Sequence, residues 1–305
     1  MVGGSADSRF IAAIGNFDGV HLGHQHLIDE TKKIARAENC APGVLVFDPH
    51  PRRYFNPDAP AFFLTSPEKR NALLEMCGVE RIFSVAFSKK IADLTPQAFV
   101  KTILRDELGL CGVVTGEEFR FGKGRAGDVE TLASLCHEYG MTAYQSSLMN
   151  KSGEDEKIGS SAVRNALRDG NVRVAAALLG RHWSVSGQIE EGQKLGRTIG
   201  FPTANLRLGD IIEPKFGVYA VTVNVAGSVH HGVANFGRRP TVGSSDPLLE
   251  VHLIEFSEDI YGASIEISFV EFIRPEQKFD QLDDLKKQIA KDKEVAIDLL
   301  RSTSS

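Results

Sequence analysis

Residues 11–28 have the sequence IAAIGNFDGVHLGHQHLI, and this stretch decides the fold that we expect for the first part of the chain. Its apolar start predicts a short strand that ends at Gly15, and the residues after His21 predict a helix. A strand, a glycine turn and a helix N-terminus bring free backbone N–H groups to one point, where they favour an anion. The stretch therefore predicts a phosphate-binding turn beside His21 and His24.

Strand-like and helix-like segments alternate from residue 9 to about residue 180. Strands are expected at 11–14, 43–47, 81–87, 111–115 and 141–145, and helices at 26–37, 67–76, 96–108, 128–139, 161–167 and 172–179. This alternation predicts a Rossmann-like α/β domain with a parallel sheet. Ligands of such sheets bind beyond the carboxyl ends of the strands, where we expect Gly15, Asp48 and Gly116.

After residue 180 the pattern changes to consecutive strands. They are expected at 185–189, 218–225, 229–234, 248–256 and 265–273, with glycine turns between them and an amphipathic helix from residue 282. Strands without intervening helices predict an antiparallel barrel or sandwich. We therefore predict two domains, residues 9–180 and 181–305.

The composition is that of an ordinary globular protein, with 42% hydrophobic and 25% charged residues. The net charge of −5 disfavours nucleic acid as a partner. No apolar run approaches the roughly 18 residues that cross a membrane, and no signal segment opens the chain, so we expect a cytoplasmic protein without a membrane partner.

Free thiols, with neither a disulfide nor a zinc site, are expected at Cys40, Cys77, Cys111 and Cys136. The sequence does not define an oligomeric state.

His21 and His24 form an HxGH sequence at the predicted helix start, and residues three apart on a helix point the same way. In a reaction at a nucleotide α-phosphate, both could donate hydrogen bonds to the oxygens on which charge accumulates. The alternatives are a metal site that includes His26, and ordinary surface histidines. The spacing disfavours the metal, because helical ligand pairs usually stand four residues apart, as in HExxH.

Three further segments carry candidate binding residues. FDPHP at 47–51 predicts a rigid polar turn, and GEEFRFGKG at 116–124 combines aromatic rings, glycines and cations that suit stacking and anion contact. IGSSAVR at 158–164 brings hydroxyls and an arginine to a helix start, which suits a phosphate. A purely structural turn, a mobile surface loop and a serine N-cap are the respective alternatives.

A second phosphate-binding segment is predicted at residues 192–205, GQKLGRTIGFPTAN. The chain has no Walker GxxxxGK[ST] sequence, so a kinase site needs another device. Here the glycines let the backbone approach phosphates, and Lys194 and Arg197 add positive charge. Thr203 and Asn205 alternate along an extended segment, so their oxygens can face one Mg²⁺ ion. A glycine-rich hairpin is the alternative.

These segments resemble a known family. NFDGVHLGHQHLI, FDPHP, GEEFRFGKGRAGD and IGSSAVRNAL, in this order, are similar to the FMN adenylyltransferase half of the bacterial bifunctional riboflavin kinase/FAD synthetases, which belongs to the nucleotidylyltransferase superfamily. GRTIGFPTAN, FGVYAV, GVANFGRRPTVG, LLEVHLIEF and DIYG are similar to the riboflavin kinase half, a small antiparallel β-barrel with a C-terminal helix. The resemblance covers nearly everything from Phe10 to Leu300.

The resemblance implies roles for individual residues. His21 and His24 would stabilise the α-phosphate, and Glu250 would accept a proton from the riboflavin 5′-hydroxyl. The ATP site of the adenylyltransferase would include Gly15, Phe17, Asp18, Gly23, Ser160, Ser161 and Arg164. The adenine and flavin side would be lined by Glu118, Phe119, Arg120 and Phe121. The kinase ATP site would include Gly192, Lys194, Gly196, Arg197, Gly200, Pro202, Thr203 and Asn205, of which Thr203 and Asn205 also meet Mg²⁺.

The implied activity is bifunctional. Riboflavin is phosphorylated by ATP to FMN, and FMN is then adenylylated by ATP to FAD with release of pyrophosphate; both steps need Mg²⁺. Two residues depart from the family pattern: Glu118 stands where Asp or Asn is usual, and Gly159 where serine is usual. They motivate one alternative, a riboflavin kinase with weak or altered adenylyltransferase activity. A non-catalytic flavin-binding regulator is the other, and the intact histidines and Glu250 argue against it.

Overall fold

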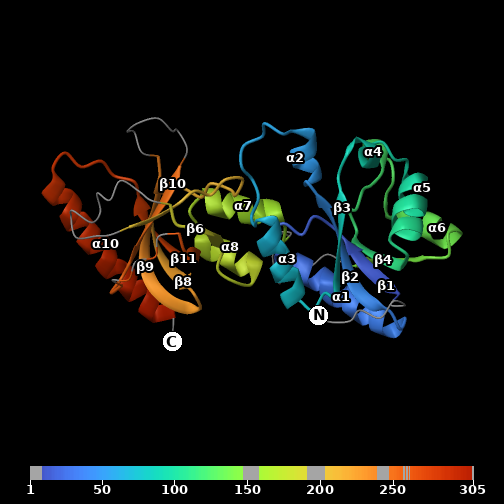
Figure 1. Ribbon diagram of the computed structural model, residues 1–305, viewed down its shortest axis with the longest axis horizontal. Coiled ribbons are helices and arrows are strands. Elements are labelled where there is room, and N and C mark those ends of the chain that lie inside the picture. The colour runs from blue at the N-terminus through green and yellow to red at the C-terminus, as the bar shows by residue number, and fades with distance from the viewer. Residues whose placement is uncertain are drawn as a thin grey trace. The chain divides into compact units, whose positions relative to one another are not determined.

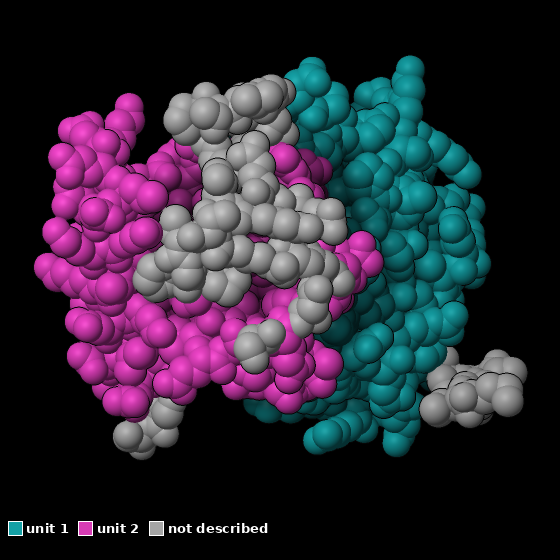
Figure 2. Space-filling view, turned by 60° about the vertical axis from the view of Figure 1, so that its left-hand side comes forward, with its two compact units in different colours: residues 1–60, 67–158 teal, residues 61–66, 159–305 magenta. Residues whose placement is uncertain are grey.

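The computed structural model describes residues 9–146, 158–190, 203–238, 247–256, 258, 260 and 262–303. The chain divides into two compact units, which Figure 2 distinguishes by colour. The first unit lies within Met1–Pro60 and Pro67–Ile158, and the second within Ala61–Ser66 and Gly159–Ser305. The chain therefore passes between the units three times, after Pro60, after Ser66 and after Ile158.

The first unit is built on a five-stranded sheet in which all neighbouring strands are parallel, as predicted (Figure 1). Its order is β3-β2-β1-β4-β5. The strands are β1 (Phe10–Ile14), β2 (Ala41–Asp48), β3 (Arg81–Ala86), β4 (Leu110–Gly116) and β5 (Thr142–Ser146). The connections run to one side of β1 and then to the other, so the strand order reverses between β1 and β4, which is where such sheets bind ligands.

Both faces of this sheet are covered by helices, and the covering explains why β1 has no polar residue. Ile11 and Ala13 share one apolar cluster with Leu27 and Ile28 of α1, whereas Ala12 and Ile14 belong to a second cluster on the opposite face. The helical segments are α1 (Leu22–Ala37), α2 (Pro51–Phe55), α3 (Pro67–Met76), α4 (Lys89–Ala92), α5 (Pro96–Ala98), the π-helix η1 (Phe99–Glu107), the 3₁₀ turn η2 (Lys123–Arg125) and α6 (Val129–Glu138).

The second unit is an antiparallel sheet of six strands in the order β6-β11-β8-β9-β10-β7. Its strands are β6 (Ser184–Gln188), β7 (Ala204–Leu206), β8 (Gly217–Val225), β9 (Ser228–Gly237), β10 (Leu248–Leu253) and β11 (Ser264–Pro275). Glu190, just after β6, forms an antiparallel bridge with Asn205 of β7, so the two edges of the sheet meet. Closure removes unpaired strand edges, and it confirms the barrel among the two predicted architectures.

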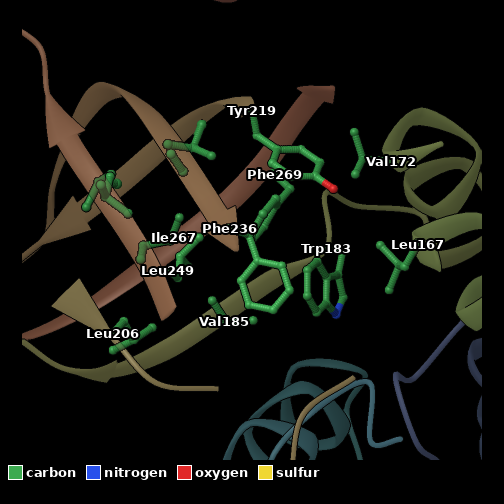
Figure 3. Packing of buried hydrophobic residues seen from close by; sticks show 14 of the residues in the cluster. Leu167, Val172, Trp183, Val185, Leu206, Tyr219, Phe236, Leu249, Ile267 and Phe269 are labelled. Carbon is green, nitrogen blue, oxygen red and sulfur yellow. The ribbon is translucent and has the colours of Figure 1, made fainter. Parts of the chain in front are cut away.

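Two helices and a short strap complete the core of the barrel. Figure 3 shows Leu167 of α7 (Ser160–Arg168) and Val172 of α8 (Val172–Leu179) facing the aromatic residues Trp183, Tyr219 and Phe236. The indole Nε1 of Trp183 donates a hydrogen bond of 2.9 Å to the carbonyl of Leu64, in the strap of residues 61–66. We predicted a domain that starts at residue 181. The second compact unit also includes residues that precede residue 181 in the chain.

The same strap also forms backbone hydrogen bonds with residues 210–212 of the second unit. The N–H groups of Phe62 and Phe63 both lie 3.2 Å from the carbonyl oxygen of Asp210, and the Ile212 N–H donates to the Phe63 carbonyl at 2.8 Å. Phe62 and Leu64 are buried in this unit. Six residues from the first half of the chain thus form part of the second unit.

The C-terminal helix α10 (Leu282–Thr303) is fastened to the barrel by an ion pair whose carboxylate is buried. Arg274 of β11 donates to Asp292 of α10 from Nε at 3.0 Å and from Nη2 at 2.7 Å, and Gln288 donates to the same carboxylate at 2.8 Å. Asp292 is only 3% exposed, so its carboxylate oxygens depend on these donors for their hydrogen bonds.

Candidate active sites

The turn after β1 has an unusual backbone. The Gly15 N–H donates to the Leu45 carbonyl at 3.1 Å, and the chain then enters the left-handed region at Phe17 (φ 52°), Gly19 (φ 83°) and Val20 (φ 41°). Phe17 and Val20 are almost completely buried. A β-branched residue with positive φ is strained, and such strain persists only where packing imposes it, often at functional sites. The predicted phosphate-binding turn is therefore a rigid feature held by its own apolar side chains.

His21 and His24 lie against each other at the start of α1. Their rings are stacked, with centroids 3.6 Å apart, and the Phe17 ring lies 5.1 Å from that of His24. His21 is the N-cap, because its Nδ1 accepts a hydrogen bond of 3.3 Å from the His24 N–H. Since Nδ1 is the acceptor, Nε2 carries the proton of the neutral ring. His21 is 6% exposed, so the capping ring lies in a largely buried position.

The packing of the His21 ring explains why a glycine stands at position 23 of the HxGH sequence. A Cβ atom at this position would lie 3.2 Å from Cε1 and from Nδ1 of the His21 ring, which is tighter than ordinary contact. Any larger residue would push the ring away from the capping position. The glycine therefore leaves room for the His21 ring in its capping position.

A cavity of about 590 Å³ lies beside this turn, wholly within the first unit. Its volume is in the range of small-molecule sites. The lining includes Gly15 and Asn16 of the turn. Its phenylalanines and arginines are Phe47, Phe55, Phe87, Phe99, Phe119, Phe121, Arg52, Arg120 and Arg125. Apolar aromatic walls with arginines among them suit a planar aromatic ligand that carries a negative group.

The aromatic rings of the cavity wall are already packed against one another, some edge to face and some stacked. The rings of Phe47 and Phe87 have centroids 5.6 Å apart, and Phe119 and Phe121 stack at 5.6 Å with an interplanar angle of 13°. Phe55 lies at the edge of the cavity and is 69% exposed. A large aromatic ring left in water beside an apolar cavity is available for stacking on a ligand.

The loop after β4 lines the cavity and is anchored at several points. The Arg120 guanidinium lies 3.3 Å from Asp128, and Lys123 forms an ion pair of 2.9 Å with Asp93. Hydrogen bonds from Thr131 hold the pKa of Asp128 below its usual value, with a smaller contribution from Arg120. The structure places all four residues of the predicted flavin and adenine loop, Glu118, Phe119, Arg120 and Phe121, on this cavity. Their ligand stays a prediction.

Two further residues, His50 and Arg70, were given no individual role in the sequence analysis. His50 follows the cis peptide bond between Asp48 and Pro49, caps α2 by accepting a hydrogen bond of 3.0 Å from the Arg52 N–H, and lines the cavity. Arg70 of α3 is 7% exposed, and burial lowers its pKa, while the carboxylates of Asp48 and Asp18 oppose that shift.

Some of the residues that line the cavity or lie near it could have been predicted from the sequence, because they stand at the ends of predicted strands. Phe47 and Phe87 stand at or just after strand ends, so the strand-end rule could have found them. Phe55, Phe99 and Arg70 lie on helices and give no such signal.

The serine and arginine motif lies at the start of α7, in the second unit. Gly159 is the N-cap in an extended conformation, and a Cβ atom there would meet no described atom within 4 Å. Arg164 is 8% exposed, and its Nε donates to the Phe62 carbonyl at 2.7 Å. Arg164 thus has a structural role in its own unit. Because His21 and His24 belong to the first unit, a site shared with Ser160, Ser161 and Arg164 stays a prediction.

The second candidate site lies on β7 and β10. Asn205 and Glu250 are direct partners in the antiparallel register, so their side chains lie side by side on one face. Thr203, two residues before Asn205, is partly exposed. Asn205 is 5% exposed, and its Oδ1 has no hydrogen-bond partner among the described residues. A buried carbonyl oxygen without a donor fits a hard cation such as Mg²⁺. Gly192, Lys194, Gly196, Arg197, Gly200 and Pro202 lie outside the described residues.

A parallel sheet with a histidine-bearing turn at a helix start, in a chain that also forms a barrel with a paired amide and carboxylate, fits a two-domain transferase of nucleotide phosphates. A family model described as FAD synthetase matches residues 4–162, and one described as riboflavin kinase matches residues 179–300. The chain belongs to the bifunctional riboflavin kinase/FMN adenylyltransferase family.

Individual relatives cover almost the whole chain. The bifunctional riboflavin kinase/FMN adenylyltransferase of Escherichia coli (strain K12) is 42% identical over 284 residues, which are 92% of this chain and 90% of that protein. The protein of the same name from Bacillus subtilis (strain 168) is 38% identical over 296 residues, 95% of this chain and 92% of that one.

A solved structure also matches most of the chain. It is described as a macrolide-efflux protein from Streptococcus pneumoniae, and it is similar with a TM-score of 0.86 and 32% identity over 96% of this chain and 95% of that one. In the part of the present chain that is described, none of the helices has the length and apolar character needed to cross a membrane.

Proposed function

We propose that this enzyme performs both reactions of its family: phosphorylation of riboflavin by ATP to FMN, and adenylylation of FMN by ATP to FAD and pyrophosphate. The proposal assigns the second reaction to the first unit and the first reaction to the barrel. It places both in the cytoplasm, with small molecules as partners. The observation that carries it is the stacked pair His21 and His24 at the start of α1, beside an aromatic cavity with arginines in its wall.

In the adenylyl transfer, the flavin ring occupies the cavity against the aromatic walls and next to Phe55. Arg52, Arg120 and Arg125 then offer positive charge to the phosphate of FMN. A phosphate oxygen of FMN attacks the α-phosphorus of ATP, and pyrophosphate leaves. The Nε2–H of His21, with the N–H groups at the start of α1, donates to the α-phosphate oxygens as charge develops on them.

The triphosphate of ATP is assigned to two groups of residues. The glycine turn with Gly15, Phe17, Asp18 and Gly23 approaches it from the first unit. Ser160, Ser161 and Arg164 hold it from the start of α7, where backbone N–H groups favour an anion. Both assignments are supported by the order and composition of the motifs.

In the kinase reaction, Glu250 accepts the proton of the riboflavin 5′-hydroxyl as that oxygen attacks the γ-phosphorus of ATP, and ADP leaves. A carboxylate can serve here, because a loose transition state requires little proton removal early in the reaction. Thr203 and Asn205 would hold Mg²⁺, and the buried Oδ1 of Asn205 supports this role. When bound, the ion would neutralise charge on the phosphates of ATP.

The function is tested by following the flavins formed from riboflavin and Mg-ATP over time by HPLC. We expect FMN to rise first and then to fall as FAD accumulates. A steady accumulation of FMN without FAD would instead support a riboflavin kinase with weak adenylyltransferase activity, the alternative that Gly159 and Glu118 motivate. If neither product forms, the enzyme proposal fails and a flavin-binding regulator is the better account.

A further inference from the structure

Two cysteines that stand 71 residues apart in sequence meet at the amino end of the parallel sheet. The Sγ atoms of Cys40 and Cys111 are 2.8 Å apart. Even non-bonded carbon atoms settle at roughly 3.5–4.0 Å, so this contact is closer than ordinary packing. Both side chains are half-buried, whereas Cys136 is fully buried. The pair therefore differs from the isolated thiols that the sequence predicts.

The meeting follows from the strand order. β1 lies between β2 and β4, and Phe10 pairs with Ala41 on one side and with Leu110 on the other. Cys40 directly precedes Ala41, and Cys111 directly follows Leu110. The two cysteines are thus next to the residues that flank the first residue of β1.

An irregularity in β4 places the second sulfur. Phe10 pairs with Leu110 but Ile11 pairs with Gly112, so Cys111 is an extra residue in the ladder. Such a bulge redirects the side chain of the extra residue. The Sγ of Cys111 lies 3.1 Å from the Phe10 carbonyl oxygen, and it reaches Cys40 across the start of β1.

The two thiols are not equally reactive. Burial, together with the neighbouring Cys40, raises the pKa of Cys111 to about 12, and the Arg9 charge opposes this only in part. A thiol with so high a pKa is rarely a thiolate at neutral pH and attacks disulfides slowly. Cys40 lies in the connection between α1 and β2 rather than inside a strand. The first attack on an external disulfide therefore falls to Cys40.

We propose that Cys40 and Cys111 form a covalent modification site, which closes to an intramolecular disulfide in the presence of a small oxidised thiol such as glutathione disulfide. The Cys40 thiolate attacks one sulfur of glutathione disulfide and releases one glutathione. Cys111 then loses its proton and attacks Sγ of Cys40 in the mixed disulfide, which releases the second glutathione. Two protein thiols lose two electrons, and one glutathione disulfide is reduced to two thiols.

The bond would affect stability more than catalysis. It would close a loop that contains β2, α2, α3 and β3, and a closed loop stabilises mainly by restricting the unfolded chain. The cysteines stand at the amino ends of β2 and β4, whereas Gly15, Asp48 and Gly116 mark the carboxyl ends. The oxidised enzyme should therefore unfold at a temperature several degrees higher, with unchanged rates.

The test incubates the full-length enzyme with glutathione disulfide, then digests it without reduction and identifies linked peptides by mass spectrometry. We expect a peptide pair that joins Cys40 to Cys111, an intact mass lower by two hydrogen atoms, and a melting temperature that returns to its starting value after dithiothreitol. Cys77→Ser is the matched control, since Cys77 is also half-buried, and this variant should still form the bond.

The single variants identify the order of attack. Cys111→Ser should accumulate one glutathione on Cys40, and Cys40→Ser should stay largely unmodified at Cys111. The proposal is overturned if the parent enzyme carries glutathione on both cysteines, if neither reacts, or if Cys77 or Cys136 takes the place of either partner.

Discussion

The two candidate sites are positioned by different kinds of structure. In the first unit, buried residues with positive φ hold a turn, and that turn presents two stacked histidines at a helix start. In the barrel, Asn205 and Glu250 are brought together by the register of two strands. A strained turn fixes where backbone N–H groups point, whereas strand register fixes which side chains share a face. Substitutions should therefore separate the two activities cleanly.

The variant His24→Ala is expected to separate the two activities most strongly. FAD formation from FMN and ATP should fall by about 10²–10³-fold, because a donor to the α-phosphate is lost. FMN formation from riboflavin should change by less than about twofold, and both rates can be followed by HPLC. The matched control is His26→Ala, on the same helix and also partly buried, which should affect neither rate. An equal loss with His26→Ala would favour the metal site, and a loss of both activities with His24→Ala would contradict separate sites.

The converse variant is Glu250→Gln. FMN formation should fall by about a hundredfold, the lower part of the range for loss of a general base, because the transition state needs little proton removal early. FAD formation from added FMN should not change. Glu255→Gln, an exposed residue just after β10, is the control. FMN production at the parental rate would rule out Glu250 as the base.

A stability difference between the units is expected from Asp292→Ala. Removing the carboxylate leaves Arg274 without its partner, and the free energy of unfolding of the barrel should fall by about 3 kcal/mol. Denaturant unfolding followed at Trp183, the single tryptophan of the chain and part of the barrel core, reports on this unit. Asp284→Ala, in the exposed first turn of α10, should have little effect. Equal unfolding midpoints for the two variants would show that the ion pair contributes nothing.

A smaller effect is expected from Phe55→Ala at the edge of the cavity. The KM for FMN should rise about tenfold, because a stacking partner worth about 1 kcal/mol or slightly more is lost. The melting temperature should stay constant, since the ring is 69% exposed. Met76→Ala, which is 83% exposed, serves as the control for loss of an exposed apolar side chain. An unchanged KM for FMN would exclude Phe55 from the flavin site.

The smallest effect concerns Gly159→Ser, which restores the residue usual in the family. A Cβ atom fits at this position, and a serine hydroxyl would add one hydrogen-bond donor at the start of α7. FAD formation should rise by a few-fold at most, with no change in FMN formation. A decrease in FAD formation would show that the flexibility of Gly159 is needed in the adenylyltransferase.

Local sequence patterns predicted most of the elements that carry the two sites, whereas β7, which carries Asn205, was expected only as an extended segment. The run that ends at Gly15, the HxGH sequence and the loop after β4 lie where the rule for strand ends places them. Residues that reach a site from a distant helix, such as Arg70 and Phe99, have no local signal. The periodicity of α7 and α8 predicted helices but could not say which core they would join. In the same way, only the position of β1 between β2 and β4 reveals that Cys40 meets Cys111.

The strap of residues 61–66 has a consequence for the dissection of this protein into fragments. A gene fragment that begins at residue 159 would encode every strand of the barrel, yet it would lack the carbonyl groups of Phe62 and Leu64 that accept from Arg164 and Trp183. The two compact units of this enzyme are therefore interleaved along the sequence. A fragment that reproduces the second unit would also have to contain residues 61–66. Circular permutation or a fused strap peptide, rather than simple cutting, is the route to an isolated kinase.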